Sequence, residues 1–215
     1  DKPGESKPVE EKPAPSTGKK PAPPPKQFKD MDDAEVHFTR TYKTDLKPGK
    51  LGEKEYLKLA SHVDGENSRL AGEFKMVKSA FKKRALEQAL ELGRDFGNST
   101  LGNYRLGESI EISKDVKVDD KAKPVFGGHT VGGDFGTTYR HELGHELYNM
   151  VFSGAKRKEW ASRVDKYVGT SVVSRYGGTN PSELFSESFA AYSSPNYERG
   201  SLPADIETWL DKTVR

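Results

Sequence analysis

Apolar residues recur along this chain mainly at helical intervals. Residues 32–42 begin with two acidic side chains, which suit the start of a helix dipole, and residues 53–62 predict a second helix. After the turn signal Asp64-Gly65, an apolar stripe at steps of three and four runs through residues 67–94 and predicts one long helix. The other face of this helix is basic, and we interpret it as an ordinary solvated surface: Lys78, Lys82, Lys83 and Arg84.

The second half of the chain predicts a small sheet and several further helices. A strand or short hairpin is indicated where four apolar residues alternate with polar ones: Ile110, Ile112, Val116 and Val118. A glycine-rich stretch follows at residues 125–136, where the backbone is bare and approachable. Helices are then expected over residues 138–151, 155–167, 181–192 and 203–212. This order predicts an α+β fold, with long helices and a small mixed sheet next to the helix at 138–151.

Residues 1–29 differ from the rest of the chain in composition. They hold most of the prolines and almost no large apolar side chain, so they cannot bury enough surface to offset chain entropy. We therefore predict a disordered linker rich in Pro, Lys and Glu, followed by one domain over residues 30–215. Residues 30–95 are its helical part, and residues 105–215 carry the candidate chemistry. Because the chain opens with Asp1, we expect a processed product or a piece of a longer polypeptide.

Charge and cysteine content narrow the choice of partners. Lys and Arg number 35 against 33 Asp and Glu, a balance that gives no basis for a nucleic-acid or membrane-surface partner. No stretch approaches the roughly 20 apolar residues of a membrane span. Cysteine is absent, so any metal ion must be held by histidine and carboxylate side chains.

The candidate chemistry begins with the sequence HELGH at residues 141–145. Side chains four apart lie on the same face of a helix, so His141 and His145 can point at one ion. Glu142 lies about a quarter turn away, within reach of a water molecule on that ion, whereas Glu146 is turned further away. A catalytic zinc site uses three protein ligands and keeps its fourth position for water. The alternative is a chance match in an ordinary helix, because the pattern is short.

A third ligand is expected from the helix at residues 181–192. Glu183 and Glu187 lie four apart on one face of this helix, away from its apolar stripe. One carboxylate can bind the metal while the other accepts the second ring N–H of a metal-bound histidine. The alternative for Glu183 is a capping box with Asn180, since Pro181 suits the first helical position. With HELGH present, we prefer ligation for Glu183.

HELGH followed by YGGTNPSELFSESFAAY resembles the gluzincin metallopeptidases of the anthrax lethal factor type. This group includes secreted Pro-Pro endopeptidases and zincin domains of phage head-morphogenesis proteins. The resemblance runs from about residue 135 to residue 192, and its two separated motifs occur in the right order. It implies a zincin-like domain in which His141, His145 and Glu183 bind Zn²⁺ and Glu142 is the general base.

The same resemblance implies roles for two further side chains. Tyr176 would stabilise the oxyanion, and Glu187 would be the acid behind a zinc-bound histidine. The residues alone leave Tyr176 open, because a phenol that donates to an oxyanion needs no special spacing and can equally be a loop or core aromatic. The chain departs from the family at Ser186, where alanine is usual; both are small, so the metal ligands are unaffected.

Three histidines lie outside these motifs. His129 falls in the glycine-rich stretch and is expected to be neutral in function, although residues 127–136 around it are a candidate strand for pairing with an extended substrate. His37 and His62 are expected on surface helices with no partner, and we assign them no role.

The expected function is that of a zinc-dependent endopeptidase acting on a protein or peptide substrate. Zn²⁺ would polarise the scissile carbonyl, Glu142 would take the proton of the attacking water, and Tyr176 would help to hold the oxyanion. The alternative is a non-catalytic zincin-fold binding or assembly module of a larger phage structural or effector protein. The suggested relatives favour a secreted or virion-associated protein over a cytoplasmic one. The PAPPPK run is a linker, a polyproline ligand for a partner, or a self-cleavage site.

Overall fold

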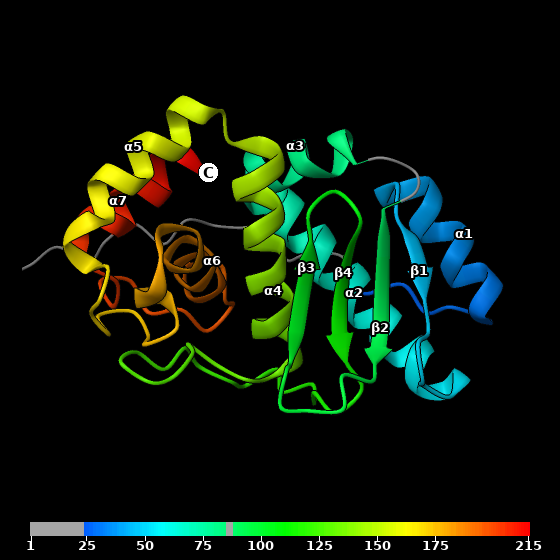
Figure 1. Ribbon diagram of the computed structural model, residues 1–215. Helices are drawn as coiled ribbons and strands as arrows, with labels where there is room; N and C mark the ends of the chain where they lie inside the picture. Colours follow the sequence, from blue (N-terminus) through cyan, green and yellow to red (C-terminus); the bar gives the residue numbers. More distant parts are fainter. Residues whose placement is uncertain (1–23, 85–87) are drawn as a thin grey trace, which may run out of the picture.

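The computed structural model describes residues 24–84 and 88–215, whose strands form one small mixed sheet. Three strands run parallel to one another: β1 (Asp45–Lys47), β2 (Ala89–Arg94) and β4 (Ser109–Ser113). The fourth, β3 (Gly102–Arg105), is antiparallel to β4. The strand order β1-β2-β4-β3 places β3 at an edge, where it lies beside helix α4 (Phe135–Glu146), as Figure 1 shows. The predicted mixture of helices with a small mixed sheet next to the HELGH helix is confirmed.

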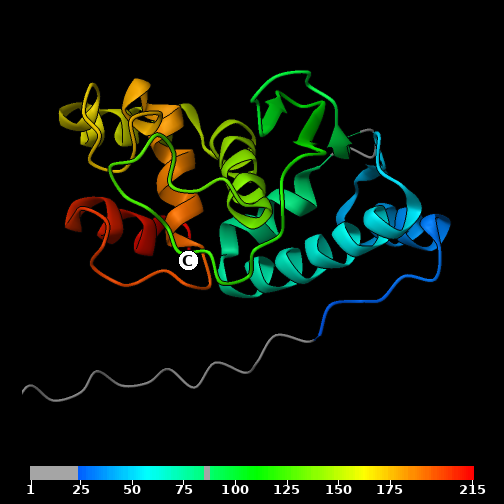
Figure 2. The same ribbon diagram turned by 90° about the horizontal axis from the view of Figure 1, so that it is seen from below.

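Helices from the first half of the described chain cover one face of the sheet: α1 (Met31–Tyr42), α2 (Glu53–Glu73) and α3 (Lys75–Lys83) (Figures 1 and 2). Alternate strand side chains point to this face, because side chains alternate along a strand. They are buried in the core: Leu46, Leu90, Leu92, Ile110 and Ile112. Strands β1 and β2 come from the 30–95 segment and β4 comes from the 105–215 segment, so the two segments share one core.

Helices of the second half form a group around α6 (Pro181–Tyr192). Helix α4 continues into a π-helical turn, η1 (Leu147–Val151), and packs against α6. Helices α5 (Gly154–Val164) and α7 (Ala204–Thr213) also pack on α6. Short 3₁₀ turns follow α5 and precede α6: η2 (Asp165–Tyr167) and η3 (Gly177–Thr179). The four helices expected here are confirmed to within a few residues.

An aromatic cluster holds α6 in this group. The ring centroid of Trp160 lies 5.5 Å from that of Phe185 and 4.7 Å from that of Trp209. The indole N–H of Trp160 also donates a hydrogen bond of 2.7 Å to the carbonyl of Pro181, at the first turn of α6. Because aromatic side chains bury large areas, this cluster fixes the helix that carries Glu183 and Glu187.

The single helix predicted over residues 67–94 is wrong. Helix α2 runs through Asp64-Gly65 to Glu73, Phe74 is extended at φ −124° and ψ 109°, and Ala89–Arg94 is strand β2. Asp64 does not end the helix, since its side chain accepts hydrogen bonds from the hydroxyl of Tyr42 and the backbone N–H of Lys26. A short apolar run fits helical and strand spacing alike, and pairing with the distant strands β1 and β4 decides between them.

The basic face assigned to that helix is also only partly solvated. Lys78, Lys82 and Lys83 are exposed, but Arg84 is buried and its guanidinium group donates two hydrogen bonds to Glu146. The interpretation of Arg84 as a surface residue is therefore wrong, because its partner lies 62 residues away and no local pattern reveals it.

The predicted sheet region needs two corrections. Val116 and Val118 follow the end of β4, and the hairpin partner of β4 is β3, which precedes it. Residues 125–134 form an irregular loop, not the substrate-pairing strand proposed for residues 127–136. Phe135 and Gly136, the last two residues of that stretch, belong to α4. Glycine pairs favour this loop, since glycine loses more conformational freedom in a strand than other residues do.

His37 and His62 both have acidic neighbours, so the expectation of partnerless surface histidines is wrong. The Nε2 atom of His37 lies 2.7 Å from Oδ1 of Asp64, and the Nδ1 atom of His62 lies 3.6 Å from Oδ1 of Asp120. Both acids lie on other elements, which sequence spacing does not indicate.

Residues 1–23 of the predicted linker lie outside the described residues. The last six residues of that linker, 24–29, lie against the folded part, where Pro25 contacts Gly65 of α2 and the backbone N–H of Lys26 donates to Asp64 (Figure 2). Asp30 then caps α1, whose first residue is Met31. A search of the described helices for one long and apolar enough to cross a membrane found none.

Candidate metal centre

Helices α4 and α6 bring His141, His145 and Glu183 together. The two Nε2 atoms are 3.1 Å apart, and Oε2 of Glu183 lies 3.3 Å from Nε2 of His141 and 3.1 Å from Nε2 of His145. Their possible ligand atoms all lie within 4.8 Å of one another. Among the described residues, this is the group of His and acidic side chains that could hold a metal ion.

The local sequence fixes where α4 begins, and so which side chains share a face of this helix. Asp134 is its N-cap, with Oδ1 accepting a hydrogen bond of 3.0 Å from the backbone N–H of Thr137. The helix is regular from there to Glu146, so His141 and His145 lie one turn apart on the same face. Gly144 lies on the side that contacts α6, where an added Cβ would be only 2.8 Å from the Cα of Ser186. This close approach of the two helix backbones brings the carboxylate of Glu183 to the imidazoles.

The N-terminus of α6 is capped by Asn180 alone. Its side chain accepts hydrogen bonds of 3.0 Å from the backbone N–H groups of Ser182 and Glu183. The carboxylate of Glu183 faces the histidines and the hydroxyl of Tyr176, which donates a hydrogen bond of 3.3 Å to Oε1. The reciprocal capping-box contact, considered as the alternative for Glu183, is therefore not formed.

A second set of contacts orients the two imidazoles. Oε1 of Glu187 lies 2.7 Å from Nδ1 of His141, and its Oε2 accepts a hydrogen bond of 2.7 Å from the backbone N–H of Val131. Nδ1 of His145 lies 3.3 Å from Oγ of Ser182, and the ring of Tyr104 in β3 stacks on His145 at a 12° interplanar angle. The expected position of Glu187 behind a histidine is thus observed.

Ser182 and Tyr104 were missed by sequence reasoning. Ser182 directly precedes Glu183, so its closeness could have been noticed from α6 alone. Tyr104 carries no such signal, because its contact depends on how β3 packs against α4.

Burial and close contacts shift the pKa values of the ligand side chains. Burial opposes the charge of Glu183, but its contacts with His141 and His145 outweigh this effect and lower its pKa to about 2. Burial likewise opposes the charge of His141, but Glu183 and Glu187 raise the pKa of this imidazole to about 10. Without a metal ion, a proton on His141 therefore compensates the carboxylates, and a bound cation would take the place of that proton.

Glu142 and Tyr176 are not ligands but lie next to them. The side chain of Glu142 is buried at 5% exposure, and burial raises its pKa despite the nearby histidines. Burial, followed by the charges of Glu183 and Glu142, raises the pKa of Tyr176 to about 12. At neutral pH the Tyr176 phenol is thus protonated and able to donate a hydrogen bond.

These residues line an open cleft of about 660 Å³. Strand β3 forms one wall, and the loop with His129, Thr130 and Gly132 forms part of the other. His129, expected to be neutral in function, lies on this wall with its ring centroid 6.1 Å from that of Tyr176. The cleft volume is in the range of small-ligand sites, and Gly102, Asn103 and Tyr104 of β3 are among its lining residues.

The donor set fits a divalent metal ion that binds nitrogen and oxygen. Oε2 of Glu183 is buried without a hydrogen-bond partner in the described part of the chain, although two imidazole nitrogens are close by. A buried carboxylate oxygen left in this condition needs an explanation, and a cation bound between it and the imidazoles supplies one. Two histidines and one carboxylate are a common ligand set of catalytic zinc.

Comparison of the chain with known proteins found no matching family model, and neither curated proteins nor solved structures gave a significant match.

Proposed function

We propose that this protein is a zinc-dependent endopeptidase of the gluzincin type, with a zincin-like fold. The observation that carries the proposal is the convergence of His141, His145 and Glu183 from two helices, with the buried carboxylate of Glu142 beside them. A purely structural zinc site needs no such acid and is closed by four protein ligands, whereas three candidate ligands are found among the described residues.

His141, His145 and Glu183 would hold the ion, and Glu187 and Ser182 would orient the two imidazoles through their second ring nitrogens. Zn²⁺ bound there supplies Lewis acidity, which polarises a carbonyl group and lowers the pKa of water to about 7. Zinc is the proposed ion because two histidines and one glutamate are a ligand set of catalytic zinc.

Glu142 is proposed to move the proton. It lies on the turn that carries both imidazoles and lines the cleft, so its carboxylate can take a proton from a water molecule that attacks the peptide carbonyl. Its raised pKa makes the carboxylate a better proton acceptor, and the same group can return the proton to the leaving amine.

Tyr176 is proposed to donate a hydrogen bond to the oxygen on which negative charge develops. Its hydroxyl reaches the site, as the contact with Glu183 indicates, and the residue is 38% exposed and lines the cleft. Because its pKa is about 12, the phenol keeps its proton at neutral pH and can act as a donor.

A peptide substrate in extended conformation is proposed to lie along β3. This strand replaces residues 127–136 as the proposed partner of the substrate. β3 is one of the two edge strands of the described sheet, and Gly102, Asn103 and Tyr104 line the cleft. Backbone groups at a sheet edge can pair with an extended chain without reading its sequence. A secreted or virion-associated location stays a prediction that rests on the sequence resemblance.

The test combines metal analysis with peptide cleavage. Wild-type protein is expected to hold about one zinc ion per chain and to cleave peptides from a mixed library. Glu142→Gln should keep the metal but lose roughly 10²- to 10⁴-fold in cleavage rate, because the isosteric amide cannot accept the proton. Glu198→Gln is the matched control, since Glu198 is exposed and pairs with Lys123, and neither residue lines the cleft.

Each result separates the two readings of the sequence. Protein without stoichiometric zinc, or a Glu142→Gln variant as active as wild type, overturns the proposal. Zinc with no cleavage by the wild type supports instead the alternative of a non-catalytic binding or assembly module.

A further inference from the structure

Gly102, the first residue of β3, lies against the carboxylate of Glu142. A Cβ atom added at Gly102 would be 2.6 Å from Oε1 of Glu142, 3.0 Å from its Cγ and 2.8 Å from Cγ2 of Thr138. Ordinary contacts between such atoms are about 3.5–4.0 Å. The space that a side chain at position 102 would fill is therefore occupied by the proposed general base.

The backbone does not require glycine at this position. Gly102 is absent from the glycines with left-handed φ values, and it pairs in register with Ile112 of β4 as any strand residue does. Glycine in a strand normally weakens it, so a glycine here needs another reason. The close approach of a side chain from the neighbouring helix is such a reason.

Few other contacts fix the position of the Glu142 carboxylate. Among the described residues, none forms a hydrogen bond with it, in contrast to Glu187, which receives one from Val131. Thr138, one turn earlier on α4, touches the same space, and its buried hydroxyl also has no hydrogen-bond partner among the described residues. The backbone of β3 at Gly102 thus lies directly against this carboxylate.

We propose that Gly102 is a positioning residue for Glu142. Because Gly102 has no side chain, a space is left between β3 and α4 that holds the Glu142 carboxylate in its active position. We call this space the seat. The functional consequence rests on the endopeptidase function proposed above. The seat itself rests only on the contacts between β3 and α4.

The same geometry separates an effect on catalysis from an effect on stability. In Gly102→Ala, the Cβ meets Oε1 and Cγ of the flexible Glu142 side chain, which can rotate away toward the cleft at small cost, and it also meets Cγ2 of Thr138. The fold and the metal ligands are then kept, but the carboxylate is displaced by roughly an ångström. A displacement of this size can cost on the order of 10² in rate.

The first experiment compares Gly102→Ala with Gly133→Ala in the zinc-loaded 215-residue chain. Gly133 is a suitable control because it precedes α4 nearby and an added Cβ would make an ordinary 3.4 Å contact with Leu101. Gly102→Ala is expected to lower kcat by about 10- to 100-fold. KM, zinc content and the urea midpoint should match those of Gly133→Ala. An equal kcat in the two variants, or a loss of zinc or stability confined to Gly102→Ala, overturns the proposal.

A second variant tests which group needs the space at Gly102: the carboxylate of Glu142 or the methyl group of Thr138. Thr138→Ser removes Cγ2 but leaves Glu142 in place. If the seat serves Glu142, the double variant Gly102→Ala with Thr138→Ser keeps the low kcat of Gly102→Ala. If kcat returns to the level of Thr138→Ser alone, the glycine accommodates the methyl group and the proposal fails.

Crystal structures of wild type and Gly102→Ala give a readout that does not depend on activity. The Glu142 carboxylate should lie roughly an ångström further from β3 in the variant, while His141 and His145 keep their positions. A carboxylate that stays in place, with β3 moved instead, overturns the seat. If wild type cleaves no peptide, the proposed function fails alone, and these two structures still decide whether Gly102 positions Glu142.

Discussion

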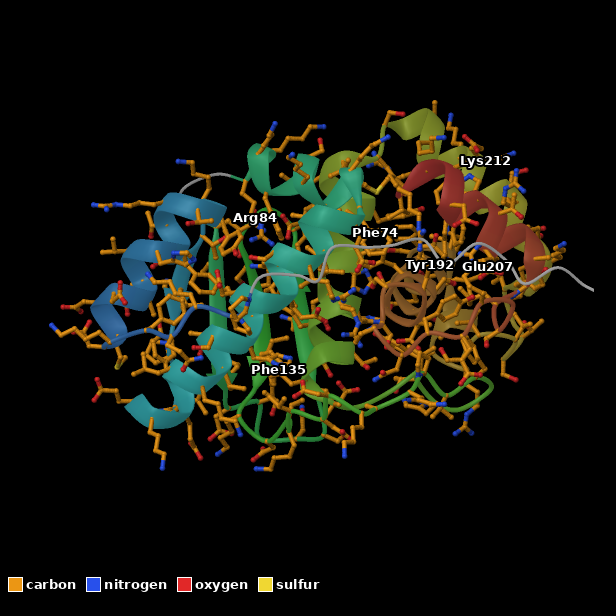
Figure 3. The ribbon with its side chains drawn as sticks, turned by 180° about the vertical axis from the view of Figure 1, so that it is seen from behind. Phe74, Arg84, Phe135, Tyr192, Glu207 and Lys212 are labelled. Carbon is orange, nitrogen blue, oxygen red and sulfur yellow. The ribbon has the colours of Figure 1, made fainter. Side chains whose placement is uncertain are left out.

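Helix α4 carries charged residues on two sides, and the two sets are satisfied in different ways. Away from the cleft, the guanidinium of Arg84 donates hydrogen bonds of 2.8 and 2.7 Å to both oxygens of Glu146 and a third of 2.8 Å to Thr44 (Figure 3 labels Arg84 beside α3). Arg140 of α4 donates a single hydrogen bond to Oε1 of Glu66 in α2. On the cleft side, Glu183 meets the α4 histidines with Oε2 left without a hydrogen bond.

The difference indicates which charges support the fold and which are available for chemistry. Buried ion pairs are stable where geometry is good and further hydrogen bonds satisfy the remaining atoms, as at Arg84. Buried polar atoms without partners and shifted pKa values concentrate at functional sites, as around Glu183 and His141. The paired side anchors α4 to α2 and α3, and so holds the other side toward the cleft.

The largest expected effect comes from breaking the ion pair between Arg84 and Glu146. Arg84→Ala should lower the free energy of unfolding by about 3–5 kcal/mol, because it leaves the charge of Glu146 buried without a partner. Urea unfolding measures this change, with Lys83→Ala, at an exposed neighbour, as the control that stays within about 0.5 kcal/mol of wild type. Replacing both partners, Arg84→Met with Glu146→Leu, should recover much of the loss. Equal stability of Arg84→Ala and Lys83→Ala would show that the pair does not anchor α4.

The next effect concerns the cleft side alone. Glu187→Gln should weaken zinc binding by about 10- to 100-fold with little change in unfolding, because the amide no longer stabilises the charge on the His141 ring. Competition with a zinc-binding dye measures the affinity. The control is Glu207→Gln, a buried glutamate of α7 that accepts hydrogen bonds from Tyr197 and Gly200 away from the site. If the two variants bind zinc equally well, Glu187 has no role behind the ligand.

A third prediction concerns the contact that joins α4 to α6. Gly144→Ala should lower the free energy of unfolding by about 1–3 kcal/mol. The added Cβ would be 2.8 Å from the Cα of Ser186, a backbone atom that cannot move away by a change of rotamer. Zinc affinity should fall with it, because Glu183 moves away from the histidines as the helices separate. Gly154→Ala, where an added Cβ meets nothing within 4 Å, is the matched control. Unchanged zinc affinity in a destabilised Gly144→Ala would separate the helix contact from the site.

A fourth prediction concerns the dependence of zinc affinity on pH. In metal-free protein the pKa of His141 is raised to about 10. Between about pH 6.5 and pH 10, where an ordinary histidine is neutral, this ring therefore carries a proton, and zinc must displace that proton to bind. Affinity should therefore rise with pH there by at most about tenfold per unit. The raised pKa also stabilises the metal-free fold below about 6.5, and this contribution is lost as pH rises toward 10. Zinc titrations and urea unfolding at several pH values test both signs, and a flat affinity profile contradicts the prediction.

Much of the candidate site could be predicted because its signals are local. The phase of α4, the Asn180 cap and Pro181 at the start of α6 depend on neighbouring residues, and these elements form where expected. The position of Glu183 on a helix that follows HELGH then narrowed the choice of third metal ligand. The error over residues 67–94 has the opposite origin, because strand β2 exists through its hydrogen bonds with β1 and β4.

The sequence by itself determined which helix faces carry imidazoles and carboxylates, since helical periodicity and capping act within a few residues. Tertiary structure alone decided that Arg84 is buried against Glu146, that Tyr104 stacks on His145 and that Gly102 lies against Glu142. These contacts join residues far apart in the chain. Their formation depends on how a strand and two helices pack together, which no short window of residues specifies.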